Sequence, residues 1–360
     1  MKNKKSGIWF LLLTVMALSA GAFTGCGTKP AGNVQGQSKE AEEIGTGKEL
    51  KTVTIGQASA GELLGGIASV AQKEGFIEEE LNAAGYKPEY IGFAGAGPEV
   101  NEAFAGNKID FAFAGNLPPI VARSNGIDIS VINVVDSDLH MAFLAQKEDD
   151  SMNGPEDLEG KTVLVGKGTI LQYLFGVVID EYGLDPDKIK VVNTVADATA
   201  AFLNGDVDVY IATDIQAQLL VSGGDGKIIF NTSDRPEWSS QQVMAARNDF
   251  LATDPEAAVA LEKAIIRAYE FANANPEKAY EDFTLDGKYT VDLIKKVYSE
   301  NNGGNGRFEF AKGDIAGADI EKLAGLCEFL YTHEIITARV DAKELVNTEY
   351  YEQALKELGK

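Results

Sequence analysis

Short β-branched or aromatic runs alternate with helical patterns along most of this chain, and this alternation restricts its possible folds more than any other feature. In the first half, strand patterns at 52–55, 86–93, 109–113 and 129–135 alternate with helical patterns at 62–73, 97–105 and 117–124. Strands that alternate with helices through short turns predict parallel βαβ units, and therefore an α/β fold.

The same alternation restarts after Asp136. Strand patterns at 161–165, 189–192, 207–211 and 227–230 alternate with helical patterns at 170–182, 196–203 and 214–221. We therefore expect two α/β units of similar size, at roughly 51–136 and 137–235. A chain of 360 residues has ample length for both units and their cores.

The part that follows, 236–360, is predicted to be mainly helical. Pro255 and Pro276 each stand where a helix would begin, with an acidic residue next to them, as helix starts prefer. Further helical patterns cover 318–330 and 342–358, and the glycine- and asparagine-rich stretch 301–306 is expected to be a loop.

The first 25 residues have the layout of an export signal. Three lysines precede an apolar run from Ile8 to Phe23, and no charge occurs between Lys5 and Lys29. An uncleaved transmembrane anchor is the alternative, since this stretch is just long enough to span a bilayer. The end of the segment, Phe23-Thr24-Gly25-Cys26, resembles the bacterial lipoprotein signal, in which the cysteine is lipidated and becomes the mature N-terminus.

The lipoprotein interpretation predicts where the chain resides. After cleavage, acylated Cys26 would hold it on the outer face of the cytoplasmic membrane or in the periplasm. Residues 26–50 are rich in Gly, Gln, Ser and Glu and lack apolar periodicity, so they are expected to form a flexible tether.

The composition excludes several classes of function. With 32 Lys and Arg against 55 Asp and Glu, the formal charge is −23, and a general affinity for nucleic acid is not expected. Two cysteines and two histidines do not make a disulfide scaffold and make a zinc site improbable, so no metal or cofactor is expected. Cys327 lies in an apolar helical pattern and is expected to be a buried free thiol.

No motif in the chain indicates catalysis. His140 and His333 have no serine or cysteine nucleophile pattern beside them, and the nucleophile elbow, the zinc-protease motif and the phosphate loop are all missing from the sequence. An enzyme is therefore not expected.

Four small, polar turns instead occur between the end of a predicted strand and the start of a predicted helix. They contain Ser59 and Gly61, Gly115 and Asn116, Gly168 and Thr169, and Thr213 and Asp214. In an open α/β sheet, ligands bind outside the carboxyl ends of the strands, where helix N-termini favour anions. Each of these residues could instead simply cap its helix, but four such turns in equivalent places favour a binding cleft between the two units.

Several segments resemble the substrate-binding proteins of nitrate, sulfonate and taurine ABC importers. They include Phe93-Ala-Gly-Ala-Gly-Pro98, Gly168-Thr-Ile-Leu-Gln-Tyr173, and residues 102–106, 109–120, 157–161 and 196–208. Together the matching segments extend over roughly residues 50–285.

The resemblance implies a type II periplasmic-binding-protein fold, with two α/β lobes that close over a ligand. The chain would cross to the second lobe near 136–141 and return near 235–242, and the helical C-terminal part would pack on the first lobe. By position, the ligand would contact Ser59, Gly61, Gly115, Asn116, Gly168, Thr169 and Asp214. Trp238 either stacks on the ligand or packs within the hinge.

The expected function follows from this resemblance. The chain would be a monomeric lipoprotein that captures a small anionic organic solute, an aliphatic sulfonate or taurine, and delivers it to ABC permease subunits. Asp214 would suit a solute that also carries an amine. Nitrate, a pyrimidine precursor or an aromatic acid remains an alternative ligand, and an enzyme or a sensor on the same fold remains an alternative role.

Overall fold

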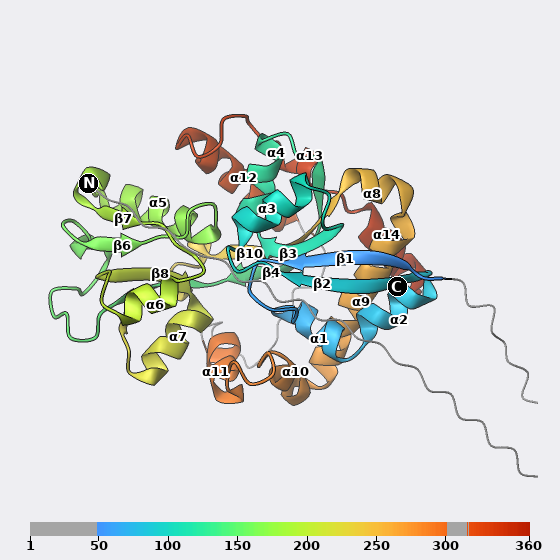
Figure 1. The fold of residues 1–360 in the computed structure, drawn as a ribbon, viewed down its shortest axis with the longest axis horizontal. Helices are drawn as coiled ribbons and strands as arrows, with labels where there is room; N and C mark the ends of the chain where they lie inside the picture. The colour runs from blue at the N-terminus through green and yellow to red at the C-terminus, as the bar shows by residue number, and fades with distance from the viewer. Residues whose placement is uncertain (1–48, 301–314, 316) are drawn as a thin grey trace, which may run out of the picture. The chain divides into compact units, whose positions relative to one another are not determined.

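The computed structural model describes residues 49–300, 315 and 317–360 (Figure 1). The strands of these residues form two five-stranded sheets, which we call the first and the second sheet. The first sheet has the order β2-β1-β3-β10-β4. Its strands are β1 (Lys51–Gln57), β2 (Tyr86–Gly92), β3 (Phe111–Gly115), β4 (Ile129–Leu139) and β10 (Ser240–Arg247).

The second sheet repeats this arrangement with the order β7-β6-β8-β5-β9. Its strands are β5 (Met141–Ala145), β6 (Thr162–Leu164), β7 (Lys190–Val192), β8 (Val209–Thr213) and β9 (Lys227–Asn231). The α/β fold expected from the alternation of strands and helices is confirmed.

One strand in each sheet departs from the expected parallel pairing. β10 is antiparallel to β3 and β4, and β5 is antiparallel to β8 and β9. These are the two strands by which the chain arrives from the other sheet. Only His140 separates β4 from β5, and only two short 3-10 turns lie between β9 and β10. Because neither connection contains the crossover helix that parallel strands need, each of these strands runs against the parallel strands of the sheet that it joins.

The two connections between the sheets are hydrogen-bonded to each other. β4 continues through His140 into β5, and β9 leads back to β10 through Thr232 and Trp238. The hydroxyl of Thr232 accepts a hydrogen bond from the Met141 amide at 2.9 Å and lies 3.2 Å from Nδ1 of His140. The outgoing and returning segments therefore form one bonded unit where the chain changes sheets.

Helices cover both faces of the first sheet. One face packs on α1 (Ile67–Lys73), α2 (Phe76–Ala83) and α9 (Pro255–Ala274), and the other packs on α3 (Gly97–Ala105) and α4 (Leu117–Ser124). Along β3, Phe111 and Phe113 lie in the first of these cores and Ala112 lies in the second. A strand buried on both faces is apolar throughout, as the sequence of β3 is.

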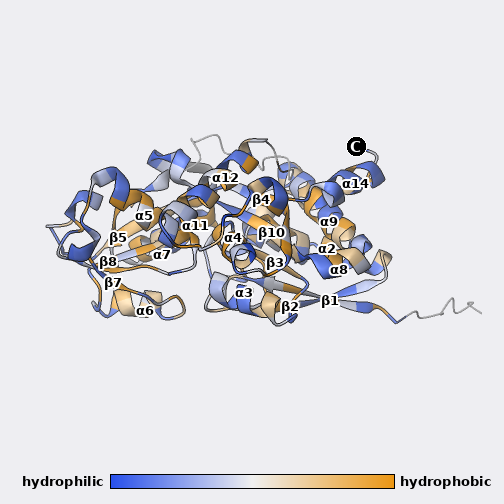
Figure 2. Ribbon diagram, turned by 90° about the horizontal axis from the view of Figure 1, so that it is seen from above, coloured by the Kyte–Doolittle hydropathy of each residue, from blue (hydrophilic) through white to orange (hydrophobic). Residues whose placement is uncertain are grey.

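The second sheet is covered in the same way. Leu174 and Val178 of α5 (Ile170–Tyr182) pack on one face, and α6 (Ala198–Leu203) and α7 (Asp214–Gly223) pack on the other. Hydrophobic residues, orange in Figure 2, follow β10 and the edge strand β4 of the first sheet, where Val243 and Val131 are fully buried.

The chain after β10 is helical, as expected. Its helices are α8 (Asn248–Thr253), α9, α10 (Pro276–Asp282), α11 (Val291–Lys295), α12 (Gly317–Thr332), α13 (Ala342–Leu345) and α14 (Glu349–Glu357). No helix within 49–300 and 317–360 has both the length and the apolar composition needed to cross a membrane. The predicted signal, most of the tether with Cys26, and the predicted loop 301–306 lie outside the described residues.

Two helix predictions were wrong in their bounds. The helix expected from residue 62 begins only at Ile67, because Gly66 has a φ of 60°, outside helical geometry. The helix expected over 342–358 is interrupted between Leu345 and Glu349. There Val346 pairs with Val131 of β4, and the Asn347 amide donates to the Val131 carbonyl, so the chain joins the edge of the sheet instead.

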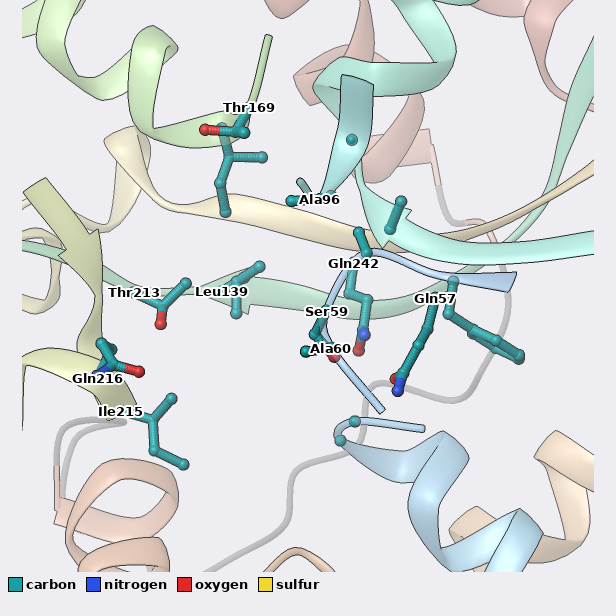
Figure 3. A pocket seen from close by; sticks show the side chains of 18 of the residues that line it. Gln57, Ser59, Ala60, Ala96, Leu139, Thr169, Thr213, Ile215, Gln216 and Gln242 are labelled. Carbon is teal, nitrogen blue, oxygen red and sulfur yellow. The ribbon is translucent and has the colours of Figure 1, made fainter. Parts of the chain in front are cut away.

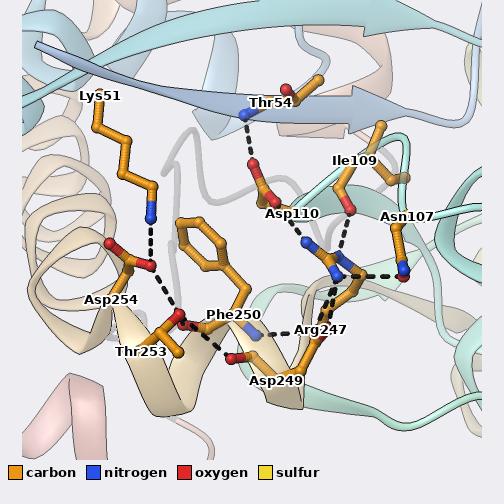
Figure 4. A network of polar contacts seen from close by, with 10 residues as sticks. All are labelled: Lys51, Thr54, Asn107, Ile109, Asp110, Arg247, Asp249, Phe250, Thr253 and Asp254. Atoms are coloured by element: carbon orange, nitrogen blue, oxygen red, sulfur yellow. Dashed lines mark hydrogen bonds and ion pairs between the residues drawn. The ribbon is translucent and has the colours of Figure 1, made fainter.

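A polar network fastens the returning strand to the first sheet (Figure 4). The Arg247 guanidinium at the end of β10 lies 2.8 Å from the Asp110 carboxylate and 3.0 Å from the Ile109 carbonyl. Asp110 also accepts the Thr54 amide of β1 at 2.9 Å. The Arg247–Asp110 ion pair is largely buried, so water and salt weaken it less than a pair at the surface. The network therefore helps to fix the register of β1, β3 and β10.

Helix α12 contacts both the connection between the sheets and the second sheet's helix α5. Asp319 at its start accepts hydrogen bonds from Ser137 and Gln241, at 2.7 and 3.0 Å. Near its end, Phe329 packs edge-on against Tyr173 of α5. The C-terminal part therefore contacts both the connection between the sheets and a helix of the second sheet.

Candidate functional site

A cavity of about 430 Å³ lies between the two sheets, where strand ends meet helix starts. From the first sheet it is lined by the ends of β1 and β3 and by parts of β4 and β10. From the second it is lined by the starts of α5 and α7. Figure 3 shows Thr213 and Gln216 on one side of the cavity and Gln57, Ser59 and Gln242 on the other.

The polar side chains of the lining are mostly neutral. The amides and hydroxyls are those of Gln57, Ser59, Thr169, Thr199, Thr213, Gln216 and Gln242. Asp136 and Lys288 are the only formally charged side chains among the described residues that line the cavity. Such a surface offers several hydrogen bonds to an anion with little net charge of its own.

Gln57 shapes the loop that carries Ser59. Its side-chain nitrogen donates to the Gly61 carbonyl at 2.8 Å and also to the Leu63 carbonyl. The Ala58 amide donates to the Phe113 carbonyl of β3 at 3.0 Å. The loop after β1 is therefore held by its own strand and by the neighbouring strand, with Ser59 at the cavity.

Gln242 reaches the cavity because two glycines stand opposite it. A Cβ atom on Gly66 would lie 2.9 Å from the Gln242 side-chain oxygen, and one on Gly65 would lie 4.0 Å from its nitrogen. The side-chain amide group of Gln242 makes no hydrogen bond to any residue in the described part of the chain. Its donor and acceptor are therefore available to a ligand.

Two neighbouring residues at the start of α7 face different surroundings. Thr213 is the N-cap residue of α7, but its hydroxyl makes no capping bond and lies at the cavity. The Asp214 carboxylate is buried and accepts hydrogen bonds from Asn231 at 2.5 Å and Gln218 at 3.3 Å. Asp214 was expected to bind the ligand, but it lies outside the cavity lining.

Thr169 lines the cavity and also caps α5. Its hydroxyl donates to the Gly166 carbonyl at 2.6 Å and accepts the Leu171 amide at 3.2 Å. Since a hydroxyl has one hydrogen, this one is already used within the protein. The capping interpretation of Thr169 therefore accounts for its hydroxyl in this structure.

Replacing Thr169 by Val is expected to lower the free energy of unfolding by about 1 kcal/mol, because the N-cap hydrogen bond is lost. Thr169→Ser should retain most of the stability, since serine caps equally well. Urea unfolding of the three proteins measures this. A valine variant with unchanged stability but weaker ligand binding would instead show that the hydroxyl acts on the ligand.

The other predicted site residues divide into two groups. Ser59 and Gly115 line the cavity with Thr169. Gly61 and Gly168 stand beside it, and both have a positive φ, of 91° and 75°.

Asn116 is buried and tied to the returning strand. Its nitrogen donates to Gln241 at 3.0 Å, and its oxygen accepts the Ser240 hydroxyl at 2.7 Å. These bonds join the end of β3 to β10, so Asn116 supports the cavity wall without lining it.

Trp238 is packed within the connection between the sheets. Its ring lies 5.6 Å from the Phe230 ring and 3.9 Å from the Arg235 guanidinium, and only 7% of its surface is exposed. It lies outside the cavity lining, which agrees with the hinge-packing interpretation.

The sequence did not indicate an aromatic wall that the C-terminal part contributes. Phe283, Tyr289 and Tyr298 line the cavity together with Tyr210 of β8. Three of these rings come from a segment more than 65 residues beyond the last predicted site turn, and no local motif marks them. The packing of α10 on α9 and of α11 on α7 brings them to the cavity.

Asp136 is the acidic member of the lining. Burial raises the pKa of its carboxyl to about 6, opposed chiefly by a hydrogen bond from the Asp138 amide. That bond is 2.9 Å long. A partly buried carboxyl facing a cavity is a group that a ligand can perturb, and the sequence did not indicate it.

Comparisons with known proteins identify relatives of this chain. The family model described as NMT1/THI5 like matches residues 70–279, which is more than half of the chain. A provisionally named aliphatic sulfonates-binding protein of Escherichia coli is 30% identical over 131 residues. That alignment covers 36% of this chain and 41% of the relative. A provisionally named binding protein of Brucella abortus is 24% identical over 205 residues, 54% of this chain and 62% of that one.

Solved structures share the fold at low sequence identity. The alkanesulfonate-binding protein SsuA of Xanthomonas axonopodis, bound to MOPS, has a TM-score of 0.69 at 18% identity, over 83% of this chain and 99% of that one. The periplasmic nitrate-binding protein NrtA of Synechocystis has a TM-score of 0.66 at 13% identity, over 86% and 89%. The chain therefore has the periplasmic-binding-protein fold, and it belongs to the NMT1/THI5-like family.

Proposed function

We propose that this chain is an extracytoplasmic solute-binding protein of an ABC importer. It captures a small anionic organic solute, an aliphatic sulfonate or taurine, and delivers it to the permease. The two sheets form two lobes, near 51–136 and 137–235, and the chain after 235 returns to the first lobe. The cavity between the sheets, lined by neutral hydrogen-bond donors, is the observation that carries this proposal.

The chemistry of the lining suits a sulfonate. Its oxygens accept hydrogen bonds from hydroxyls and amides, which Ser59, Thr213 and Gln242 offer from opposite sides of the cavity. The starts of α5 and α7 add backbone amides and the positive ends of two helix dipoles. A cavity of about 430 Å³ is within the range of small-molecule sites.

The names of the relatives support the same class of ligand. One curated relative is named for aliphatic sulfonates, and one structural neighbour is an alkanesulfonate-binding protein. The nitrate-binding neighbour is consistent with anion binding on this fold.

The proposal includes no chemical step on the ligand. Burial raises the pKa of the Cys327 thiol to about 12, and His140 lies 3.2 Å from the Thr232 hydroxyl. Neither residue is part of the lining. Among the described residues, no cysteine or histidine therefore faces the cavity as a nucleophile or base.

An aromatic acid or a pyrimidine precursor is the second candidate ligand. The wall formed by Tyr210, Tyr289 and Tyr298 favours it, because aromatic rings stack on one another and on heterocycles. Such a ligand would use the same donors on the opposite wall.

A thermal-shift screen tests the proposed ligand class. Ethanesulfonate, taurine, nitrate and benzoate are added separately to the chain that begins at residue 26, with Cys26→Ser to prevent acylation. A solute that binds only the folded state at 100 times its Kd adds about 2.7 kcal/mol and raises Tm. We expect one of the sulfonates to give the largest rise. A rise with benzoate alone would support the second candidate, and no rise with either sulfonate would contradict the proposal.

Anchoring through Cys26 is a separate part of the proposal. In cells labelled with radioactive palmitate, the wild-type chain should incorporate label and Cys26→Ala should not. Cys327→Ala is the matched control, since it removes the other cysteine of the chain. Equal labelling of wild type and Cys26→Ala would contradict the lipid anchor without affecting the ligand proposal.

A further inference from the structure

Two side chains of opposite charge line the same cavity. Asp136 comes from β4, close to where the chain leaves the first sheet, and Lys288 comes from the segment between α10 and α11. All other side chains of the described lining are uncharged.

Neither of these two charges is neutralised by an ion pair within the described residues. The Asp136 carboxylate accepts the backbone amide of Asp138 at 2.9 Å. The Lys288 ammonium lies 5.2 Å from the centre of the Tyr289 ring and meets no carboxylate in the described chain. The cavity therefore has an anionic and a cationic group whose charges are both open to a ligand.

The two groups are also separate from each other. The cation whose field acts on Asp136 is Lys322 of α12, not Lys288. Lys322 lies outside the lining, and its ammonium donates to the Ser137 carbonyl at 2.9 Å and the Ser239 hydroxyl at 2.6 Å. Asp136 and Lys288 are therefore two charged groups of the cavity wall that are not paired with each other.

An unpaired charge at a partly buried wall is unfavourable unless the ligand supplies its counter-charge. A purely anionic solute would pair with Lys288 but would leave Asp136 unpaired and close to a like charge. We propose that the cavity selects zwitterionic solutes, in which a cationic nitrogen pairs with Asp136 and the acidic group binds Lys288 and the neutral donors. This inference rests on the proposed function and specifies its ligand class.

The charge of Asp136 should make this selectivity depend on pH. Its carboxyl, with a pKa of about 6, faces Asp138 on its own strand, Lys322 of α12, and the phenols of Tyr269 and Tyr298. Below pH 6 the carboxyl becomes neutral and no longer attracts a cationic nitrogen. The preference for a zwitterion should therefore weaken as the pH falls from 7.5 to 5.

Calorimetric titration with taurine and ethanesulfonate tests the inference, because these probes differ only in the amino group. Wild type should bind taurine at least about tenfold more tightly, and Asp136→Asn should bring the two affinities within about threefold of each other. Lys288→Gln should weaken both and leave their ratio unchanged. Asp206→Asn, which removes an exposed carboxylate outside the cavity, is the matched control.

The possible outcomes separate this inference from the proposed function. The inference would be overturned if wild type bound taurine and ethanesulfonate equally, or if Asp136→Asn kept the wild-type ratio of the two affinities. Binding of ethanesulfonate would in that case still support the proposed function. Failure of both probes to bind would overturn the function and the inference together. If Asp136→Asn does not fold, the wild-type affinity ratio at pH 7.5 and pH 5 decides, and a constant ratio contradicts the inference.

Discussion

Gly115→Ala is expected to weaken sulfonate binding by about 5- to 150-fold while the protein remains folded. A Cβ atom on Gly115, at the end of β3, would lie 2.4 Å from Cγ2 of Ile170. Ile170 begins α5, which packs on the second sheet, so the added methyl group pushes apart the two walls of the cavity. Overpacking of this kind costs about 1–3 kcal/mol, and 1.4 kcal/mol is a tenfold change in Kd.

A second substitution separates this steric effect from damage to the fold. Adding Ile170→Ala to Gly115→Ala removes the side chain that the methyl group meets, and should restore much of the affinity for taurine measured by calorimetry. Gly325→Ala is the control, because nothing lies within 4 Å of the Cβ position there. Wild-type affinity in Gly115→Ala, or no recovery in the double variant, would show that closure at this contact does not control binding.

Glu262→Ala is expected to lower the free energy of unfolding by about 2–5 kcal/mol. The substitution leaves a cavity in place of the glutamate side chain and removes the hydrogen-bond partner of the Asn133 side-chain amide. Glu262 of α9 and Asn133 of β4 are both fully buried, and the Asn133 nitrogen donates to Oε2 of Glu262. Among the described residues, Oε1 of Glu262 and the side-chain oxygen of Asn133 have no hydrogen-bond partner. We infer that Glu262 is neutral, because a protonated carboxyl adds a hydrogen-bond donor and avoids a buried charge.

The pH dependence of stability tests that assignment. Burial raises the pKa of Glu262 well above its ordinary 4.5, so the folded state holds this proton more tightly than the unfolded state. The resulting stabilisation is complete below pH 4.5 and is lost as the pH rises through the folded-state pKa. Glu262→Gln, which keeps the size and the hydrogen bonds, should remove this dependence. Urea unfolding at pH 5 and pH 8 measures both proteins, and an equal pH effect in both would contradict a neutral Glu262.

Much of the fold could be predicted because it depends on local patterns. α3, α4 and α5 have the predicted bounds, since each begins where a strand pattern ends and carries one apolar face. The antiparallel strands β5 and β10 could not be derived in this way. Their direction depends on how the chain travels between the sheets, which is a long-range property.

The candidate site was less predictable for the same reason. Strand-end turns led to Ser59, Gly115 and Thr169, which line the cavity. Gln242 and Tyr298 lie more than a hundred residues after Gly115 in the sequence, and the fold brings them to the same cavity. No local sequence pattern marks either residue. Thr213 and Asp214 are adjacent, yet only Thr213 lines the cavity, because Asn231 and Gln218 hold the Asp214 carboxylate outside it.

The net charge of −23 affects how an acidic solute could reach this cavity. Long-range attraction is not available to an anion, and salt screens the repulsion beyond about 8 Å at physiological ionic strength. Affinity must therefore come from local groups, namely Lys288 and the hydroxyl and amide donors of the lining.

Calorimetric titration of taurine into the chain from residue 26 onward tests whether the cavity binds a sulfonate solute. We expect one taurine per chain with a micromolar or lower Kd, which is a binding free energy of about −8 kcal/mol or more favourable. We also expect Gln242→Leu, which removes an available donor in the cavity, to weaken that binding. No heat of binding with taurine or ethanesulfonate, or tight binding that Gln242→Leu leaves unchanged, would contradict sulfonate binding in this cavity.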